Sequence, residues 1–337
     1  MSRVAVIGAG AWGTALAVTL ARKGTHTIRL WANEPEVVEG IAKSRTNDRF
    51  LPGFELPEAI EPTNHLNHAL EAAEIVVSVM PSQHCRVLFE SMASSLRPET
   101  LVVSCTKGLE GATLLRMTEV IADVLRKSKL TPRVGALSGP SFAKEVARGD
   151  PTAVTVASAD SELARAVQEA FNSSRFRVYT NDDVIGVELG GALKNIIAIA
   201  AGVCDGLELG HNSVAALITR GLAEIARLVV ACGGRLDTMA GLAGLGDLVL
   251  TCTGDLSRNR SVGVELGKGR KLSDVIAGMH GAVAEGVFTT KAAVGLARQK
   301  HVEMPITEQM FAILEKGKSP QQAIEELMTR AARSESY

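Results

Sequence analysis

Hydrophobic positions follow two different patterns along the chain, and the first pattern covers residues 3 to about 180. There, short runs rich in β-branched residues alternate with helical stretches. Several runs, such as IVVSVM and TLVVSC, are continuously apolar, which is typical of strands that helices cover on both faces. The expected strands are Val4–Gly8, Thr27–Trp31, Ile75–Met80, Thr100–Cys105, Val134–Ser138, Ala153–Ala157 and Phe176–Thr180. This repetition predicts a doubly wound, mostly parallel α/β sheet.

After about residue 184 the strands stop, and the sequence is that of helices separated by glycines. The expected helices are Ile185–Val203, Val214–Cys232, a segment after Arg258, Thr289–Gln299 and Ile306–Leu314. One run, VLTCT at residues 249–253, is a weak strand candidate because it is β-branched and apolar. We therefore expect an α/β domain over residues 1–183 and an all-α domain over residues 184–337, closely packed because no flexible linker separates them.

Composition and charge narrow the class of protein. Of the 337 residues, 46% are hydrophobic and 22% are charged, which excludes a mainly disordered chain. The net charge of −1 gives no reason to expect nucleic acid or a membrane surface as a partner. The five cysteines are scattered and lack CxxC spacing, which predicts neither a disulfide framework nor a zinc site. With no signal peptide before the first strand, a cytoplasmic protein is expected.

The strongest local motif is VAVIGAGAWGTALAVTLARKG, in which a strand runs through a glycine-rich turn into a helix. Gly8 permits the tight turn, Gly10 lets a diphosphate approach the backbone, and Gly13 lets the helix pack closely on the strand. The free N–H groups at the start of that helix are suited to hold the diphosphate. This arrangement predicts a Rossmann domain that binds a dinucleotide.

The choice between NAD and NADP stays open. An acidic residue after the second strand commonly binds the ribose 2′-hydroxyl of NAD, whereas an arginine there favours the phosphate of NADP. Here Asn33 is uncharged, Glu34 would repel a phosphate, and Arg29 lies within the strand.

One charged residue is out of place in the apolar segment GVELGGALKNIIAIAAGV, residues 186–203. On a helix, the neighbours of Lys194 are glycines and apolar residues, and Glu188 faces another side of the helix. Asp247 follows three glycines at the edge of an apolar run and needs a partner of opposite charge, so we expect it to pair with Lys194. The pair is either structural or catalytic.

Three further segments carry polar groups at places that suit a ligand. Lys107 ends the strand in VSCTKGLEG, and Gly139-Pro140-Ser141 ends another, with Ser141 either capping the next helix or contacting a ligand. Ser257, Arg258 and Asn259 stand in the segment SRNR, where arginine suits the planar, bidentate binding of phosphate. The alternatives are a surface lysine at residue 107 and a solvated loop at SRNR.

Together these blocks resemble the NAD(P)-dependent glycerol-3-phosphate dehydrogenases of the bacterial form. The resemblance runs through GAGAWGTALA, TKGLE, SGPSFAKE, GVELGGALKN, AGLGDLVLTCT, SRNR and AEGVFTTK, almost the whole chain. It implies reversible hydride transfer between NAD(P)H and dihydroxyacetone phosphate, giving sn-glycerol 3-phosphate for phospholipid synthesis. It also implies a Rossmann domain followed by a helical domain, usually in a homodimer.

The resemblance assigns roles to individual positions. Lys194 matches the catalytic proton donor and acceptor, with Asp247 beside it. The positions that match substrate-binding residues are Lys107, Gly139, Ser141, Lys194, Asp247, Ser257, Arg258 and Asn259. Cofactor binding is expected at Gly8, Gly10, Ala11, Trp12, Gly13, Asn33, Lys107, Ala143, Arg258, Val283 and Glu285. The chain departs from the family at Asn33, where His or Arg is common, and at Ser141, where Thr is frequent.

Two other functions fit parts of the pattern. One is a different Rossmann-plus-helical dehydrogenase acting on a 3-hydroxy acid or its CoA ester, but Arg258 and Asn259 suit a small phosphate better than a bare carboxylate. The other is a dinucleotide sensor without chemistry, which would not need a lysine in an apolar helix. No metal is expected.

Overall fold

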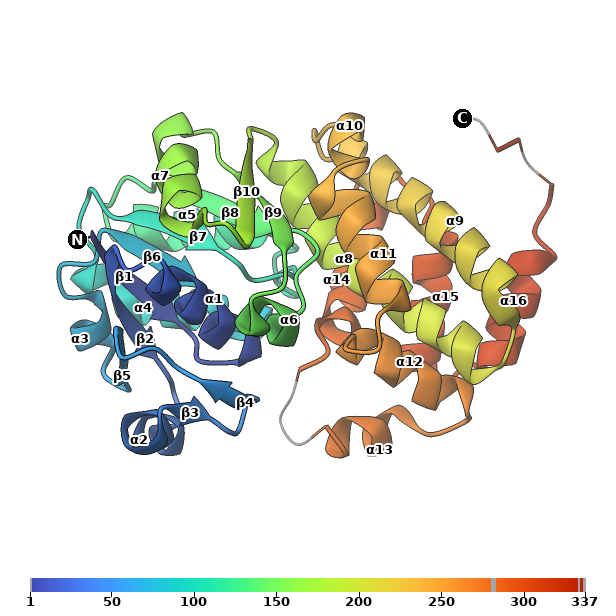
Figure 1. Ribbon diagram of the computed structural model, residues 1–337. Coiled ribbons are helices and arrows are strands. Elements are labelled where there is room, and N and C mark those ends of the chain that lie inside the picture. Colours follow the sequence, from blue (N-terminus) through green and yellow to red (C-terminus); the bar gives the residue numbers. More distant parts are fainter. Residues whose placement is uncertain (1, 280–282, 333, 336–337) are drawn as a thin grey trace.

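The computed structural model describes residues 2–279, 283–332 and 334–335. A sheet flanked by helices forms the N-terminal part, and helices alone form the C-terminal part beside it (Figure 1). The strands of the main sheet are β1 (Ser2–Ile7), β2 (His26–Trp31), β5 (Ile60–Thr63), β6 (Ile75–Ser78), β7 (Leu101–Ser104), β8 (Val134–Ser138), β9 (Thr152–Ala157) and β10 (Phe176–Asn181). The seven strands expected from the sequence are confirmed, with ends shifted by at most two residues; β5 was not expected.

The sheet has the order β10-β9-β8-β7-β6-β1-β2-β5, and its neighbours are parallel except for β8 and β9. The predicted doubly wound, mostly parallel fold is therefore confirmed. Because β1, β2, β6, β7 and β8 all run the same way, the segments that follow them meet at one edge of the sheet. This carboxyl edge is where such sheets bind ligands.

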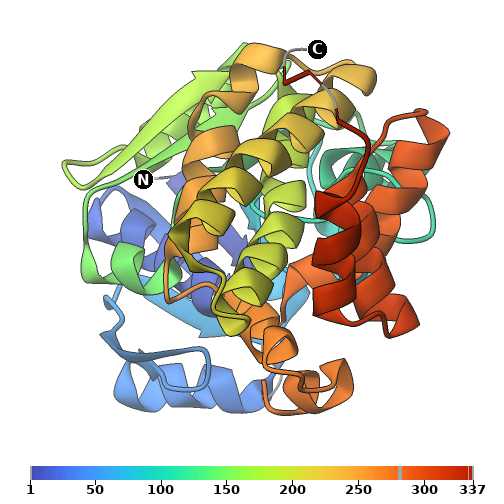
Figure 2. The same ribbon diagram turned by 90° about the vertical axis from the view of Figure 1, so that its right-hand side faces the viewer.

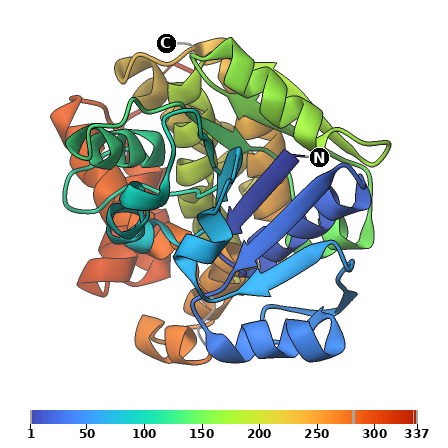
Figure 3. The ribbon, with the colours of Figure 1, turned by 90° about the vertical axis from the view of Figure 1, so that its left-hand side faces the viewer.

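Helices cover both faces of the sheet (Figures 1 and 3). On one face, α1 (Ala11–Arg22), α6 (Ala143–Arg148) and α7 (Ser161–Phe171) share a core with the strands. The opposite core contains α3 (Leu66–Leu70), α4 (Cys85–Met92) and α5 (Met117–Lys127). The other elements of this part are α2 (Pro35–Ser44), the hairpin β3 (Thr46–Asn47) and β4 (Leu51–Glu55), and the 3₁₀ turns η1 (Ser82–His84) and η2 (Ala93–Ser95).

The C-terminal part is built around α8 (Val184–Gly206), which is buried from Gly186 to Cys204. By length and composition α8 could cross a membrane, but 83% of its most apolar window is buried inside the protein. The surrounding elements are α9 (Gly210–Ala231), α10 (Leu236–Met239), the π-helical turn η3 (Leu242–Gly246), α11 (Asp247–Thr253), α12 (Arg258–Gly267), α13 (Leu272–Ala277), α14 (Glu285–Gln299), α15 (Pro305–Lys316) and α16 (Pro320–Met328). Figure 2 shows α9 lying along the outside of this bundle. The five expected helices are confirmed as α8, α9, α12, α14 and α15.

One sequence prediction in this part is wrong. The run 249–253 is not a strand but belongs to helix α11. Its buried positions, Leu248, Thr251 and Cys252, recur at the spacing of one helix face, and that face packs on α8. Burial of this face outweighs the β-branched composition.

Glycines bring α8 and α12 unusually close together. A Cβ at Gly202 would lie 2.0 Å from the carbonyl oxygen of Arg260, and one at Gly263 would lie 1.9 Å from that of Ile199. Neither position accepts a larger residue unless the helices separate. This contact fixes the distance between the lysine on α8 and the SRNR segment at the start of α12.

Candidate active site

The expected pair of Lys194 and Asp247 is present. Lys194 on α8 donates a hydrogen bond from Nζ to Oδ1 of Asp247 at 2.9 Å, and both side chains are almost completely buried. Glu188, six residues earlier on α8, faces a different region, where it accepts hydrogen bonds from Arg116 and Thr118 of the sheet part. The only carboxylate that neutralises Lys194 is therefore Asp247, within the part of the chain that the structure describes.

A second lysine shares the same carboxylate. Lys107, which follows β7, donates from Nζ to Oδ2 of Asp247 at 2.6 Å and to the carbonyl oxygen of Gly139 at 3.1 Å. Lys107 is thus part of the lysine–aspartate cluster rather than a solvated surface lysine. Two ammonium groups and one carboxylate leave a net positive charge in a mostly buried place, which favours binding of an anion or of a developing oxyanion.

Burial and the neighbouring charges shift the pKa values of Lys194 and Asp247. Burial lowers the pKa of Lys194 to about 8, against the opposing effect of Asp247 and with a further lowering by Lys107. Burial alone would raise the pKa of Asp247, but the two ammonium groups outweigh it and hold that pKa below its usual range. Lys194 is therefore charged at neutral pH but closer to losing its proton than an ordinary lysine.

Thr251, which was not singled out from the sequence, is a further partner of this cluster. Its hydroxyl lies 2.6 Å from Nζ of Lys194 and also donates to the backbone carbonyl of Asp247 at 2.6 Å. Thr251 follows Asp247 by four residues, so both face the same side of α11. The signal was present in the spacing, but the interpretation of 249–253 as a strand concealed it.

Ser141 does not cap a helix. The N-cap of α6 is Phe142, and the hydroxyl of Ser141 donates to the carbonyl oxygen of Gly139 at 2.9 Å. That same carbonyl accepts the bond from Lys107, so Gly139 and Ser141 stand directly beside the lysine–aspartate cluster. Gly139 has φ +142°, and a Cβ there would meet Val154 at 2.9 Å.

The SRNR segment divides into one free and several engaged groups. Ser257 caps α12 by accepting a hydrogen bond from the backbone N–H of Arg260, and the guanidinium of Arg260 pairs with Asp205 at 2.8 Å and with Asp255 at 3.1 Å. Arg258, in contrast, forms no hydrogen bond or ion pair with any described residue. Of the two arginines, only Arg258 is available for a ligand.

Arg258 is exposed to solvent by surface area, yet the surrounding protein lowers its pKa, partly opposed by the charge of Glu285. The side chain of Arg258 therefore reaches solvent while neighbouring protein atoms surround part of it. The arginine stays charged throughout the ordinary pH range, because the ordinary pKa is far above neutrality. An unpaired guanidinium held in such a place is suited to bind a phosphate.

Asn259 is buried, and its amide connects three helices. Its Nδ2 donates to Oδ1 of Asn195 on α8 at 2.9 Å, and its Oδ1 accepts from the backbone N–H of Gly286 on α14 at 3.0 Å. Each of these three residues directly follows a candidate site residue in the chain: Asn195 follows Lys194, Asn259 follows Arg258, and Gly286 follows Glu285. Asn259 and Asn195 therefore fix the positions of the three charged groups relative to one another.

Glu285 links the helical part to the carboxyl edge of the sheet. Its carboxylate accepts hydrogen bonds from the backbone N–H and the hydroxyl of Ser82, which follows β6, at 3.1 and 2.7 Å. Burial raises the pKa of Glu285, while these bonds and the charge of Arg258 oppose the rise. Ser82 was not identified from the sequence, because nothing in its local pattern distinguishes it from an ordinary loop serine.

The glycine-rich turn has the shape that a dinucleotide needs. Gly8 has φ +120°, and a Cβ at Gly13 would lie 1.8 Å from the carbonyl oxygen of Gly8, so the helix packs directly on the turn. A Cβ at Gly10 would meet nothing within 4 Å, and no side chain caps the start of α1. Backbone N–H groups at this helix end are thus open to a diphosphate.

The remaining cofactor candidates surround this turn and the carboxyl edge. Trp12 is partly buried, and its Nε1 has no hydrogen-bond partner among the described residues. Asn33 is exposed just beyond β2, next to the turn, because the N–H of Gly8 donates to the carbonyl of Trp31. Ala143, at the first position of α6, and Val283, two residues before α14, are half-buried.

Arg29 is not available for the phosphate of NADP. Its guanidinium pairs with Glu61 and Glu71, both at 3.2 Å. The charge that would favour NADP is therefore neutralised by Glu61 of β5 and by Glu71 at the end of α3.

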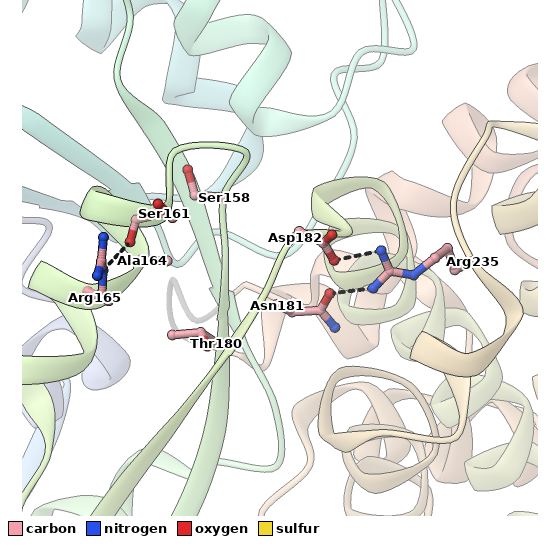
Figure 4. A pocket seen from close by; sticks show the side chains of 8 residues that line it. All are labelled: Ser158, Ser161, Ala164, Arg165, Thr180, Asn181, Asp182 and Arg235. Atoms are coloured by element: carbon pink, nitrogen blue, oxygen red, sulfur yellow. Dashed lines mark hydrogen bonds and ion pairs between the residues drawn. The ribbon is translucent and has the colours of Figure 1, made fainter.

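A hollow of the described chain lies away from this cluster. It has a volume of about 650 Å³ and lies between α7, the end of β10 and Arg235 (Figure 4). Arg235 is engaged by Asp182 at 2.6 Å and by Asn181 at 3.1 Å, and Arg165 bonds its own helix. The side chains that line the hollow do not converge on a common point (Figure 4). The cluster around Asp247 is therefore the better candidate for the active site.

Comparison with known proteins gives full-length matches. The sequence model for the N-terminus of NAD-dependent glycerol-3-phosphate dehydrogenase matches residues 3–164, and that for the C-terminus matches residues 183–325. A glycerol-3-phosphate dehydrogenase [NAD(P)+] of Koribacter versatilis is 67% identical over 99% of both chains, and one of Acidobacterium capsulatum is 58% identical over 99% of this chain and 100% of its own. The crystal structure of glycerol-3-phosphate dehydrogenase from Coxiella burnetii, 43% identical, superposes with a TM-score of 0.93 over 98% of this chain and 99% of its own.

Proposed function

The chain belongs to the NAD-dependent glycerol-3-phosphate dehydrogenase family, and from this premise we propose which of its residues carry out the reaction. The protein is an NAD(P)-dependent oxidoreductase that interconverts dihydroxyacetone phosphate and sn-glycerol 3-phosphate. The comparisons give no support to a hydroxyacyl-CoA dehydrogenase or to a sensor without chemistry.

Lys194 is the group that exchanges a proton with the substrate. Reduction of the ketone requires a hydride on C2 and a proton on the attached oxygen. The reduced nicotinamide supplies the hydride when it is bound. Lys194 supplies the proton, and its pKa of about 8 leaves it charged at neutral pH while making the proton easier to release than that of a free lysine. The ketone becomes a secondary alcohol, and the lysine is left neutral; oxidation of the alcohol reverses both transfers.

Asp247 and Lys107 set the charge of the site during this step. Before proton transfer, two ammonium groups face one carboxylate, and the excess positive charge stabilises the negative charge that develops on the substrate oxygen. After transfer, Lys107 and Asp247 remain as a neutral pair. The carboxylate also orients Lys194, together with the hydroxyl of Thr251.

Arg258 holds the phosphate of the substrate. It is the member of SRNR that no described residue engages, and it lies one residue from Asn259, whose amide bonds lead to α8 beside Lys194. A guanidinium binds a phosphate through two parallel N–H bonds and stays charged. Ser257 and Asn259 support this site as the cap and the anchor of α12. Gly139 and Ser141 complete the substrate side next to Lys107.

The cofactor is NAD or NADP, and the turn from Gly8 to Gly13 would hold its diphosphate. Trp12, Asn33, Ala143, Val283 and Glu285 are the further cofactor contacts in this proposal. We further propose that residues 1–183 form the dinucleotide-binding domain and residues 184–337 the substrate domain. The enzyme would be a cytoplasmic homodimer without nucleic-acid or membrane partners. The product would feed phospholipid synthesis.

The observation that carries the proposal is the buried carboxylate of Asp247 between two lysines at the carboxyl edge of the sheet. The direct test is to mix the protein with NADH or NADPH and dihydroxyacetone phosphate, and to follow loss of the absorbance of the reduced nicotinamide. Rapid loss with the phosphorylated ketone, and little with free dihydroxyacetone or with a 3-keto acid, is expected. Equal rates with all three substrates would contradict the proposed phosphate site. The same assay compares the two cofactors.

A further inference from the structure

A buried asparagine outside the glycine-rich turn holds that turn in shape. Asn47, in the short strand β3, is 2% exposed and reaches across to the turn. Its Nδ2 donates to the carbonyl oxygen of Ala9 at 2.8 Å and to the hydroxyl of Thr14 at 2.8 Å. The hydroxyl of Thr14 in turn donates to the same carbonyl at 3.1 Å. Two side-chain donors thus converge on one backbone oxygen between Gly8 and Gly10.

Because the peptide bond is planar, the contacts to the carbonyl of Ala9 also set the direction of the N–H of Gly10. The carbonyl of Ala9 and the N–H of Gly10 belong to one planar, trans peptide unit, so they point in opposite directions. Because Asn47 and Thr14 hold the carbonyl on the protein side, the N–H of Gly10 is turned away from them. This N–H donates to no acceptor among the described residues, and the space next to Gly10 is open.

The asparagine is itself fixed by its hairpin. Its Oδ1 accepts a hydrogen bond from the backbone N–H of Phe50 at 3.2 Å, so the amide cannot flip without losing both of its donor contacts. The hairpin in turn packs on the core that contains α1, through Leu51 and Phe50. A neutral amide suits this position, because a carboxylate would face two oxygen atoms and add a negative charge near the diphosphate.

We propose that Asn47 is a positioning residue for the dinucleotide: it orients the Ala9–Gly10 peptide so that the N–H of Gly10 points at the diphosphate. The inference rests on the dinucleotide site proposed above. Asn47 acts through the backbone and does not touch the ligand. Its loss should therefore weaken binding of molecules that carry the diphosphate, without altering the proton-transfer step.

The test is equilibrium binding of NADH to Asn47→Ala, measured by titration calorimetry in the absence of substrate. Loss of a hydrogen bond to a buried carbonyl should raise the dissociation constant about five- to twentyfold, while kcat and the KM for dihydroxyacetone phosphate stay within about twofold. In competition experiments, the dissociation constant of ADP-ribose should rise by the same factor as that of NADH. The dissociation constant of adenosine, which lacks the diphosphate, should not change. Asn47→Asp should bind more weakly than Asn47→Ala.

The control is Asn172→Ala. Asn172 also uses its side chain to bond a backbone group, the N–H of Val178 at 2.7 Å, but at the far side of the sheet part. The Asn172→Ala substitution should lower the melting temperature while leaving the dissociation constant of NADH unchanged. If Asn47→Ala fails to fold, Thr14→Val should raise that constant and Thr14→Ser should restore it, since only the second keeps the hydroxyl.

The proposal is overturned if a folded Asn47→Ala binds NADH within about twofold of the unaltered protein, or if adenosine and ADP-ribose weaken equally. Either result would limit Asn47 to stabilising the hairpin. A different result would contradict the proposed reaction: the unaltered protein would bind NADH but would not reduce dihydroxyacetone phosphate.

Discussion

The ammonium of Lys194 and the carboxylate of Asp247 lie 2.9 Å apart, and both side chains are almost completely buried. Burial alone makes each charge costly, so each depends on the other. Lys107 completes the cluster from the opposite side of the carboxylate. The protonation state of Lys194 therefore depends on the balance of these charges.

Asp247→Asn should change the pH dependence of the reaction. Without the negative charge, the two ammonium groups repel one another, and the pKa of Lys194 should fall below its value of about 8. Reduction requires the protonated lysine, so its rate should begin to decline at a lower pH than in the unaltered enzyme. The measurement is kcat/KM for dihydroxyacetone phosphate against pH. A decline at the same or a higher pH would show that Asp247 does not control the lysine.

Arg258→Ala should weaken recognition of the phosphate. Loss of a charge-assisted bond should lower kcat/KM for dihydroxyacetone phosphate about 10- to 100-fold and leave that for free dihydroxyacetone nearly unchanged. Arg260→Ala is the matched control, because it removes a neighbouring guanidinium that only pairs with Asp205 and Asp255. The control should lower stability without changing the ratio between the two substrates. Equal losses on both substrates in Arg258→Ala would argue against a phosphate contact.

Gly263→Ala should separate α12 from α8. The new Cβ would lie 1.9 Å from the carbonyl oxygen of Ile199, so the backbone must move. Overpacking of this kind costs about 1–3 kcal/mol and should displace Arg258 relative to Lys194. The free energy of unfolding in urea and the KM for dihydroxyacetone phosphate measure the two effects. Gly278→Ala, whose nearest contact would be 3.5 Å away, should change neither; an unaffected Gly263→Ala would refute the tight helix contact.

Much of the fold could be predicted because the local patterns are strong. Continuously apolar runs gave the strands that are buried on both faces, and the last expected strand, which ends at Thr180, corresponds to β10, which ends at Asn181. The edge strand β5 and the hairpin of β3 and β4 were missed because β3 has only two residues, and because β4 and β5 contain proline and lack a clear period. Their packing on the core is a tertiary effect that the local sequence does not show.

The site could be predicted in part for a similar reason. A charge in an apolar helix needs a partner, which led from Lys194 to Asp247. Lys107 was singled out by its place at the end of a strand, but its bond to Asp247 joins residues 140 positions apart and depends on how the helical part sits against the sheet edge. Asn47 gave no signal at all, because an asparagine in a polar loop segment looks like a turn residue until its buried partner is known.

The most direct test of the central claim is the turnover of Lys194→Met with dihydroxyacetone phosphate. Methionine roughly keeps the length of the stem and removes the ammonium, so the variant lacks its proton donor while Lys107 still neutralises Asp247. The comparison is Lys127→Met, which removes an exposed lysine that pairs with Asp123 on α5. We predict that a folded Lys194→Met loses at least about 100-fold in kcat, the lower end of what a general acid contributes, and that Lys127→Met loses nothing. A Lys194→Met enzyme within about threefold of the unaltered protein would contradict the assignment of Lys194 as the proton donor.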